Sequence, residues 1–222
     1  MHLFADRADA GRRLVEALAA YANRPDAIVL ALPRGGVPVG YEIARRLGLA
    51  LDVYVVRKLG VPGHEELAMG ALASDGTCVF DAELIESLGI SDAALEQVVA
   101  RETAELARRQ EAYRDARPQA DIASKTVIVV DDGLATGATM RAAATALRAR
   151  DPAAILAAVP VAAPRTCASL DRFADRVVCI AGPEPFHAVG LYYRNFEQTS
   201  DEEVRRLLAQ AAANLAGRPV NA

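Results

Sequence analysis

The sequence has little of several features that mark particular classes of protein. It holds three cysteines, Cys78, Cys167 and Cys179, and no CxxC spacing. Zinc sites and disulfide frameworks depend on such spacing or on an even set of cysteines, so we expect reduced thiols, no protein-held metal centre and a cytoplasmic chain. No apolar run approaches the ~20 residues of a membrane helix. The opening stretch, MHLFADRADAGRR, lacks the apolar segment of a signal peptide, so we expect no membrane association.

Positive charge is also scarce. The chain carries 25 Lys and Arg against 29 Asp and Glu, a formal net charge of −4, which argues against nucleic acid binding through bulk charge. Lysine occurs only at Lys58 and Lys125, so a lysine is more informative here than one of the many arginines. With 222 residues, 52% hydrophobic and 24% charged, the chain has the composition of one globular domain over residues 1–222.

Five short apolar runs are the candidate strands. None of them alternates apolar and polar residues for long, which is typical of parallel strands covered on both faces. Helical patterns at 37–47 and 139–150 lie between them, so we expect an α/β fold with a five-stranded parallel sheet and helices on both faces. The runs are Ile28–Leu32, Val53–Val56, Val127–Val130, Ile155–Val161 and Val177–Ile180.

Four other segments fall outside this alternation. Helices are expected at 6–22, at 91–117 and at 201–216. For the second, Ser91 is a suitable N-cap and Pro118 ends it; for the third, Ser200 and Glu203 stand in capping-box positions. Residues 60–76 contain four glycines and no clear period until Leu67, so they predict a long loop with a hairpin across residues 74–76.

The segment VIVVDDGLATGAT, residues 127–139, carries the most chemical information. A buried strand leads into Asp131 and Asp132, and a glycine-containing turn then precedes a helix. Backbone N–H groups of such a turn at a helix N-terminus can surround a phosphate. Carboxylates accept hydrogen bonds only, so they suit sugar hydroxyls. The pattern indicates a ribose 5-phosphate site, although a strand followed by DDG can also be a plain βα turn.

This segment resembles the phosphoribosyl pyrophosphate (PRPP) signature of the type I phosphoribosyltransferases. The resemblance covers about residues 27–182 and leaves an inserted helical segment at 81–120 and a hood with a C-terminal helix at 183–216. It implies that Asp131 and Asp132 hold the ribose 2- and 3-hydroxyls. It also implies a 5-phosphate loop, made by Gly133, Ala135, Thr136, Gly137, Ala138 and Thr139.

Two further segments fit the resemblance. Arg34, Gly35 and Gly36 follow the first strand, where family members bind pyrophosphate and often hold a non-proline cis peptide. Arg57 and Lys58 follow the second expected strand and would contact pyrophosphate beneath a closing loop at 60–76. His64 in that loop is either a proton relay or a solvated side chain.

The implied reaction is displacement of pyrophosphate from PRPP by a nitrogen acceptor, with Mg²⁺ held mainly by the substrate. Tyr192, Tyr193 and Phe196 are the candidate base-stacking residues, or else they seal the core beneath the last helix. The alternative function is a regulatory protein that binds PRPP or a nucleotide without turnover. The family also implies a homodimer, to which the helix at 91–117 is one possible contributor.

Overall fold

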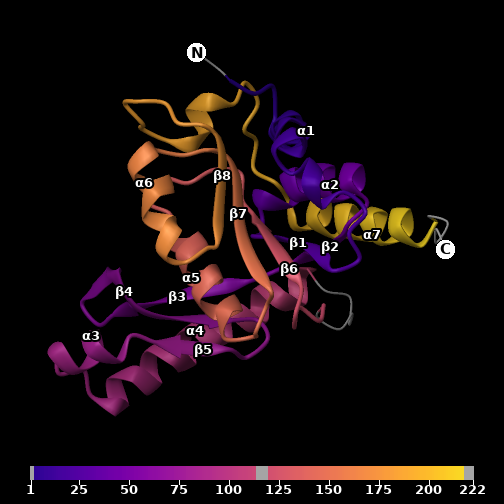
Figure 1. Cartoon of the computed structure of the whole chain (residues 1–222). Coiled ribbons are helices and arrows are strands. Elements are labelled where there is room, and N and C mark those ends of the chain that lie inside the picture. Colours follow the sequence, from indigo (N-terminus) through magenta and orange to yellow (C-terminus); the bar gives the residue numbers. More distant parts are fainter. Residues whose placement is uncertain (1–2, 114–119, 218–222) are drawn as a thin grey trace.

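A five-stranded parallel sheet forms the centre of the protein (Figure 1). The computed structural model describes residues 3–113 and 120–217, except for the side chains of Glu66 and Ala112. The strand order is β2-β1-β6-β7-β8. The strands are β1 (Ala27–Ala31), β2 (Ala50–Val53), β6 (Thr126–Val130), β7 (Ala154–Val161) and β8 (Arg176–Ala181). Every residue of β1 and β6 is buried, which explains why their sequences do not alternate.

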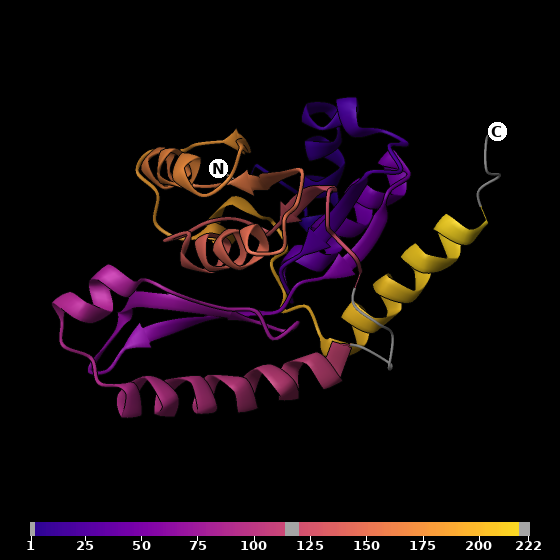
Figure 2. The ribbon, with the colours of Figure 1, turned by 60° about the horizontal axis from the view of Figure 1, so that its bottom comes forward.

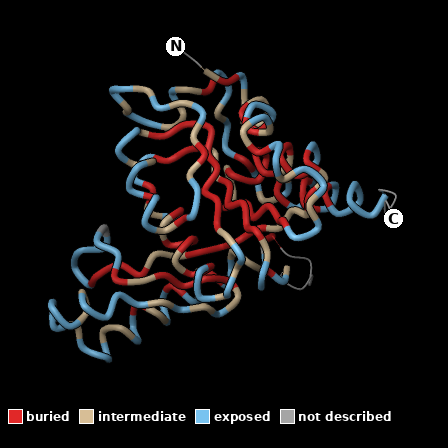
Figure 3. The backbone as a smooth tube through the Cα atoms, in the orientation of Figure 1, coloured by how far each residue is buried: buried red, intermediate tan, exposed pale blue. Residues whose placement is uncertain are grey.

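Helices cover both faces of this sheet, as the sequence predicts. The principal ones are α1 (Arg7–Ala17), α2 (Gly36–Leu47) and α5 (Ala138–Arg148). Leu14 of α1 and Ile43 of α2 pack with Val29 on one face. Met140 of α5 packs with Ile28 on the other. Buried residues are concentrated in and around this layered centre (Figure 3), so the α/β prediction is confirmed.

A second, antiparallel sheet extends from the centre as an arm, residues 56–113 (Figure 2). It comprises β3 (Val56–Val61), β4 (His64–Ala73), β5 (Cys78–Phe80), α3 (Ala82–Ser87) and α4 (Asp92–Tyr113). Leu59 and Met69 pack with Val98 of α4, whereas Val56 and Ala71 share a cluster with α5. The sheet of the arm is therefore held between α4 and α5.

The arm corrects two predictions. The expected strand Val53–Val56 is divided, because β2 ends at Val53 and β3 begins at Val56 in the other sheet. The expected long loop at 60–76 is mostly the β3–β4 hairpin. The pairing register shifts on both sides of Gly60, and a glycine at such a bulge conceals the strand period. The hairpin expected across residues 74–76 is confirmed, since it joins β4 to β5.

The expected helices are present with modest differences at their ends. The N-terminal one is α1 followed by a 3-10 turn, Ala19–Tyr21. The side chain of Ser91 accepts the N–H of Ala94 at 3.3 Å before α4. The side chain of Ser200 accepts the N–H of Glu203 at 3.1 Å before α7 (Asp201–Ala216). Residues 114–117 of the expected helix and Pro118, expected to end it, lie outside the described residues.

The hood segment, residues 183–200, lies beside the N-terminus (Figure 1). Phe4 pairs with Tyr193 in a short parallel bridge. Their rings join Val161 of β7 in a small apolar cluster. A short helix, α6 (Pro164–Ser169), precedes β8. Within the described ranges, no helix combines the length and the apolar character needed to cross a membrane.

Candidate active site

The turn after β6 is the centre of the candidate site. Asp131 and Asp132 follow the strand directly, and α5 begins at Ala138. Gly137 occupies the left-handed region with φ +74°, a conformation that glycine adopts without strain. The first-turn N–H groups of α5 have no partner within the helix, so the turn ends on a cluster of donors that suits an anion.

Two side chains from outside the turn hold its backbone in place. The hydroxyl of Thr166 donates to the carbonyl of Ala135 at 3.1 Å. The guanidinium of Arg141 donates to the carbonyl of Thr136 at 2.8 Å. These bonds occupy carbonyl groups of the turn, and the N–H of Ala138 donates to Oγ1 of Thr136 at 3.4 Å. Side chains of α5 and α6 thus hold the turn in shape.

The carboxyl groups of Asp131 and Asp132 both have raised pKa values. The N–H of Asp132 donates to Oδ1 of Asp131 at 2.8 Å. Burial raises the pKa of Asp131 well above its ordinary 3.8, and the negative charge of Asp132 raises it further. Burial also raises the pKa of Asp132, although Nε of Arg7 lies 2.7 Å from its Oδ2 and opposes the shift. Raised carboxyl pKa values in a small region are typical of functional sites.

The loop after β1 closes against these carboxylates. The peptide bond between Pro33 and Arg34 is cis, which is the feature the family resemblance suggested for this loop. A Cβ atom placed on Gly35 would lie 2.0 Å from Oδ2 of Asp132, so only glycine fits there. Arg34 reaches Asp201 of α7 at 3.5 Å. The two predicted loops therefore touch one another at Gly35 and Asp132.

A cavity of about 330 Å³ joins three of the predicted segments. The lining of the cavity includes Pro33 from the loop after β1, Arg57 and Lys58 from β3, and Thr136 from the turn after β6. The basic pair lies within β3 rather than after a strand. Ala138 and Thr139 also line the cavity, and so does Arg109 of α4, which the sequence reading did not single out.

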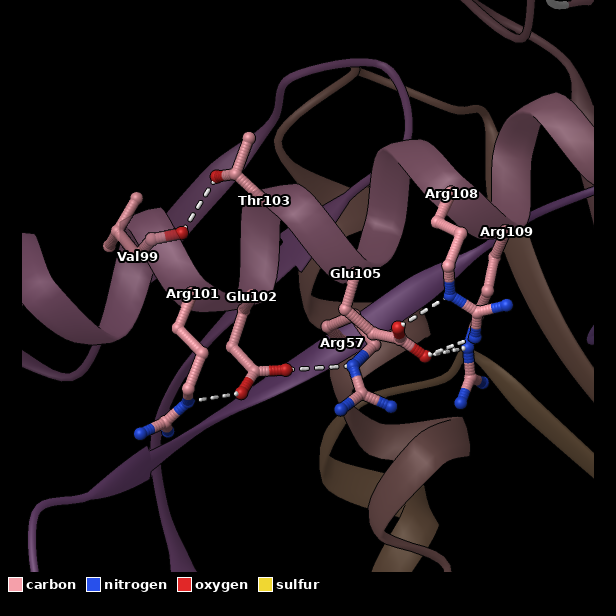
Figure 4. A network of polar contacts seen from close by, with 8 residues as sticks. All are labelled: Arg57, Val99, Arg101, Glu102, Thr103, Glu105, Arg108 and Arg109. Atoms are coloured by element: carbon pink, nitrogen blue, oxygen red, sulfur yellow. Dashed lines mark hydrogen bonds and ion pairs between the residues drawn. The ribbon is translucent and has the colours of Figure 1, made fainter.

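Helix α4 holds the cations of this cavity with its own carboxylates (Figure 4). Glu102 accepts from Arg57 at 2.8 Å and from Arg101 at 3.1 Å. Glu105 accepts from Arg109 at 2.7 Å and from Arg108 at 2.9 Å. Burial favours a higher pKa for Glu102, but the hydrogen bonds from the two arginines outweigh it and lower that pKa. The arm therefore orients Arg57 and Arg109 through charged hydrogen bonds.

The hood residues divide into a buried ring and two more accessible ones. Tyr193 is 2% exposed, and its hydroxyl donates to the carbonyl of Asp132 at 2.5 Å. This corrects the expectation that Tyr193 presents a face to a base, because its ring belongs to the core. Phe196 and Tyr192 remain half-buried. The guanidinium of Arg7 covers the ring of Phe196, with its Cζ atom 3.9 Å from the ring centroid.

The model of the phosphoribosyl transferase domain family matches residues 4–194, most of the chain. The chain belongs to this family. A Mycobacterium tuberculosis protein provisionally named as a phosphoribosyl transferase is 44% identical over 216 residues, in two strains. The match covers 97% of this chain and 48% of that protein, so the chain spans about half the length of these relatives.

The solved structure of TT1426 from Thermus thermophilus is also similar to this phosphoribosyl transferase domain. The two chains are 42% identical with a TM-score of 0.87. The alignment covers 95% of this chain and 99% of TT1426. The similarity extends through the arm as well as the central sheet, because little of either chain is left outside it.

Sequence reasoning about this phosphoribosyl transferase domain missed two arginines of the site. Arg7 is 125 positions from Asp132, and Arg109 enters the cavity from the inserted helix. No local motif marks either of them among 23 arginines. His64, by contrast, is exposed at the start of β4 and is not among the residues that line the cavity.

Proposed function

We propose that this chain catalyses transfer of the ribose 5-phosphate group of PRPP to a nitrogen acceptor, a nucleobase or a related base. One observation carries the proposal: three segments from distant parts of the chain meet around one cavity, and two of these segments also meet at Gly35 and Asp132. The segments are the turn after β6, the loop after β1 and the first residues of β3. A phosphate, a diol and a pyrophosphate attached to one sugar would match these three groups of side chains.

The chemistry follows from the charges. The bond between the anomeric carbon and the pyrophosphate oxygen breaks, and its electron pair leaves with pyrophosphate. A bond from the acceptor nitrogen to that carbon forms, and the nitrogen gives up its proton. The sugar gains positive character in the transition state, as in glycoside hydrolysis. Asp131 and Asp132 stabilise this charge, while Arg34, Arg57 and Lys58 stabilise the leaving group.

Arg109 belongs with the pyrophosphate group in this proposal. It lines the same cavity as Lys58 and Thr139, and Glu105 orients it. An arginine can hold two phosphate oxygens at once because its donors form a rigid planar fork. We therefore assign to α4 a direct role in binding the leaving group.

Magnesium fits this site as part of the substrate. In the described ranges there is no group of three or more His, Cys, Asp or Glu side chains that could hold a metal ion. Asp131 and Asp132 are the carboxylates nearest to the proposed ribose, and they would hold the ion directly or through water. Bound there, Mg²⁺ supplies Lewis-acid stabilisation to pyrophosphate and ribose oxygens.

The acceptor would bind on the hood side of the ribose. Tyr192 and Phe196 remain half-buried and supply aromatic surface there. Tyr192 is already oriented, because its hydroxyl donates to the carbonyl of Pro185 at 3.2 Å and its ring stacks on Phe186. A planar base that stacks in this region would face the anomeric carbon from the side opposite pyrophosphate.

The test is release of pyrophosphate from PRPP and Mg²⁺ in the presence of single bases. Release that depends on one base supports the transferase. Binding of PRPP with no release for any base would instead favour a regulatory protein, and the absence of binding would overturn both functions.

The matched variants are Lys58→Ala and Lys125→Ala, the two lysines of the chain. Lys58 lines the cavity, whereas Lys125 precedes β6 at the opposite end of that strand from Asp131. We expect turnover to fall at least about tenfold in the first, because one charged phosphate contact is lost. Turnover should be unchanged in the second, and both variants should keep the wild-type circular dichroism spectrum.

A further inference from the structure

Arg7 makes three contacts that join separate parts of the molecule. Its Nε donates to Oδ2 of Asp132 at 2.7 Å, and its NH1 group donates to the carbonyl of Glu197 at 2.6 Å. The flat guanidinium lies over the ring of Phe196. The side chains of Arg7 and Asp132 are only 12% and 14% exposed. An ion pair this enclosed is screened less by solvent and salt than an exposed one.

The surroundings of Asp132 leave few other groups to balance its charge. Asp131 adds a second negative charge from the same turn. From the loop after β1, Gly35 contributes only backbone at the point of closest approach. From the hood segment, the hydroxyl of Tyr193 donates to the main-chain carbonyl of Asp132 rather than to its carboxylate. Arg7 on α1 is the cation that the described contacts place against this carboxylate.

We propose that Arg7 is a positioning residue that fixes the carboxylate of Asp132 for the ribose hydroxyls and links it to the hood through Phe196 and Glu197. The ribose part of this inference rests on the proposed function. Because Arg7 engages Oδ2, the other oxygen, Oδ1, remains to accept from a hydroxyl group. The link through Phe196 makes the arrangement of the ribose site depend on the arrangement of the acceptor side.

The physical basis is geometric. An aspartate side chain can adopt several rotamers unless a partner holds it, and the Nε contact with Arg7 fixes the position of Oδ2. The bond from the NH1 group to the Glu197 carbonyl and the contact with the Phe196 ring fix the guanidinium in turn. Removal of Arg7 should therefore free the Asp132 carboxylate to rotate and loosen its link to the hood.

Two substitutions separate charge from geometry. Arg7→Gln keeps a hydrogen-bond donor but removes the charge. Arg7→Lys keeps the charge but loses the planar fork that reaches Asp132, Glu197 and the Phe196 ring together. Arg12→Gln is the matched control, because Arg12 lies on the same helix, is 40% exposed and lies 3.5 Å from Asp9, away from Asp132.

The first measurement needs no ligand. Crystal structures of the variants show where the Asp132 carboxylate and the Phe196 ring lie. We expect the Asp132 side chain to change its rotamer or lose its single position in Arg7→Gln, to keep its position in part in Arg7→Lys, and to stay unchanged in Arg12→Gln. An Asp132 side chain and a Phe196 ring in the wild-type positions in Arg7→Gln would overturn the inference.

The second measurement is PRPP affinity by calorimetry with Mg²⁺ present. We expect Arg7→Gln to bind PRPP about tenfold more weakly, because the ribose hydroxyls then meet a carboxylate that is no longer held in place. Arg7→Lys should recover part of the affinity. Equal affinities of the wild type and Arg7→Gln would refute the positioning role. If the wild type binds no PRPP, the proposed function fails, while the crystal structures of the variants still test the hold of Arg7 on Asp132.

Discussion

The hydroxyl of Tyr193 allows a direct test of how the hood supports the turn at Asp132. It lies in the core and donates to the carbonyl of Asp132 at 2.5 Å, while the ring packs between Phe4 and Phe196 at centroid distances of 5.3 and 4.9 Å. Tyr193→Phe keeps the ring and removes only this donor. The substitution therefore isolates one buried hydrogen bond that anchors the backbone of Asp132.

The size of the effect follows from burial. A buried carbonyl that loses its donor costs about 1–3 kcal/mol, because no water replaces the lost bond. For a domain of this length, each kcal/mol corresponds to a fall of about 2–4 °C in the melting temperature. We expect a decrease in the free energy of unfolding within that range and no change in the slope of the denaturant curve.

The assay is urea unfolding followed by circular dichroism, with Tyr192→Phe as the control. The hydroxyl of Tyr192 also donates to a backbone carbonyl, that of Pro185, at 3.2 Å, but its side chain is only half-buried. Water can replace that bond, so we expect a change below about 0.5 kcal/mol. Equal stability of Tyr193→Phe and the wild type would refute the reasoning, and would reopen a base-binding role for Tyr193.

Three other predictions test different parts of the site. Gly35→Ala should weaken PRPP binding and lower the free energy of unfolding by about 1–3 kcal/mol, because the added Cβ would lie 2.0 Å from Oδ2 of Asp132. Gly217→Ala is the control in calorimetry and urea unfolding, because its Cβ would meet its nearest neighbour at 3.5 Å. Equal losses in the two variants would contradict the packing argument. Glu102→Gln should lower the free energy of unfolding by about 1–3 kcal/mol, because the side chain at position 102 is only 10% exposed and its two arginine partners lose their charged acceptor. Glu105→Gln should change urea unfolding little, because the side chain of Glu105 is 29% exposed and water can replace its bonds. The reverse order would refute this account of α4. PRPP affinity should fall with decreasing pH well above pH 3.8, because the raised pKa of Asp131 lets the folded protein take up that proton early. A flat profile of PRPP affinity from neutral to mildly acidic pH would contradict a role of Asp131 in binding. The same raised pKa also affects stability: the contribution of Asp131 to the free energy of unfolding is present at low pH and is lost as the pH rises through the folded-state pKa.

The sequence alone determined the turn after β6 and the strands of the central sheet other than β2, because these depend on local patterns. Uninterrupted apolar runs mark strands that are covered on both faces, and the caps at Ser91 and Ser200 depend on residues three positions away. The two aspartates and the glycine at residue 137 lie within one short segment of the chain. Their arrangement at the start of α5 is fixed by backbone geometry over a few residues.

Only the tertiary structure decided which distant side chains complete the site. Arg7 meets Asp132 across 125 positions, Arg57 meets Glu102 across 45, and Tyr193 reaches Asp132 across 61. The hairpin of the arm was concealed because glycine at its bulge interrupts the strand period, and its apolar side chains are buried by α4 and α5. Such contacts depend on how the folded layers bring surfaces together, and a pattern along the chain carries no information about which of 23 arginines will face a buried carboxylate.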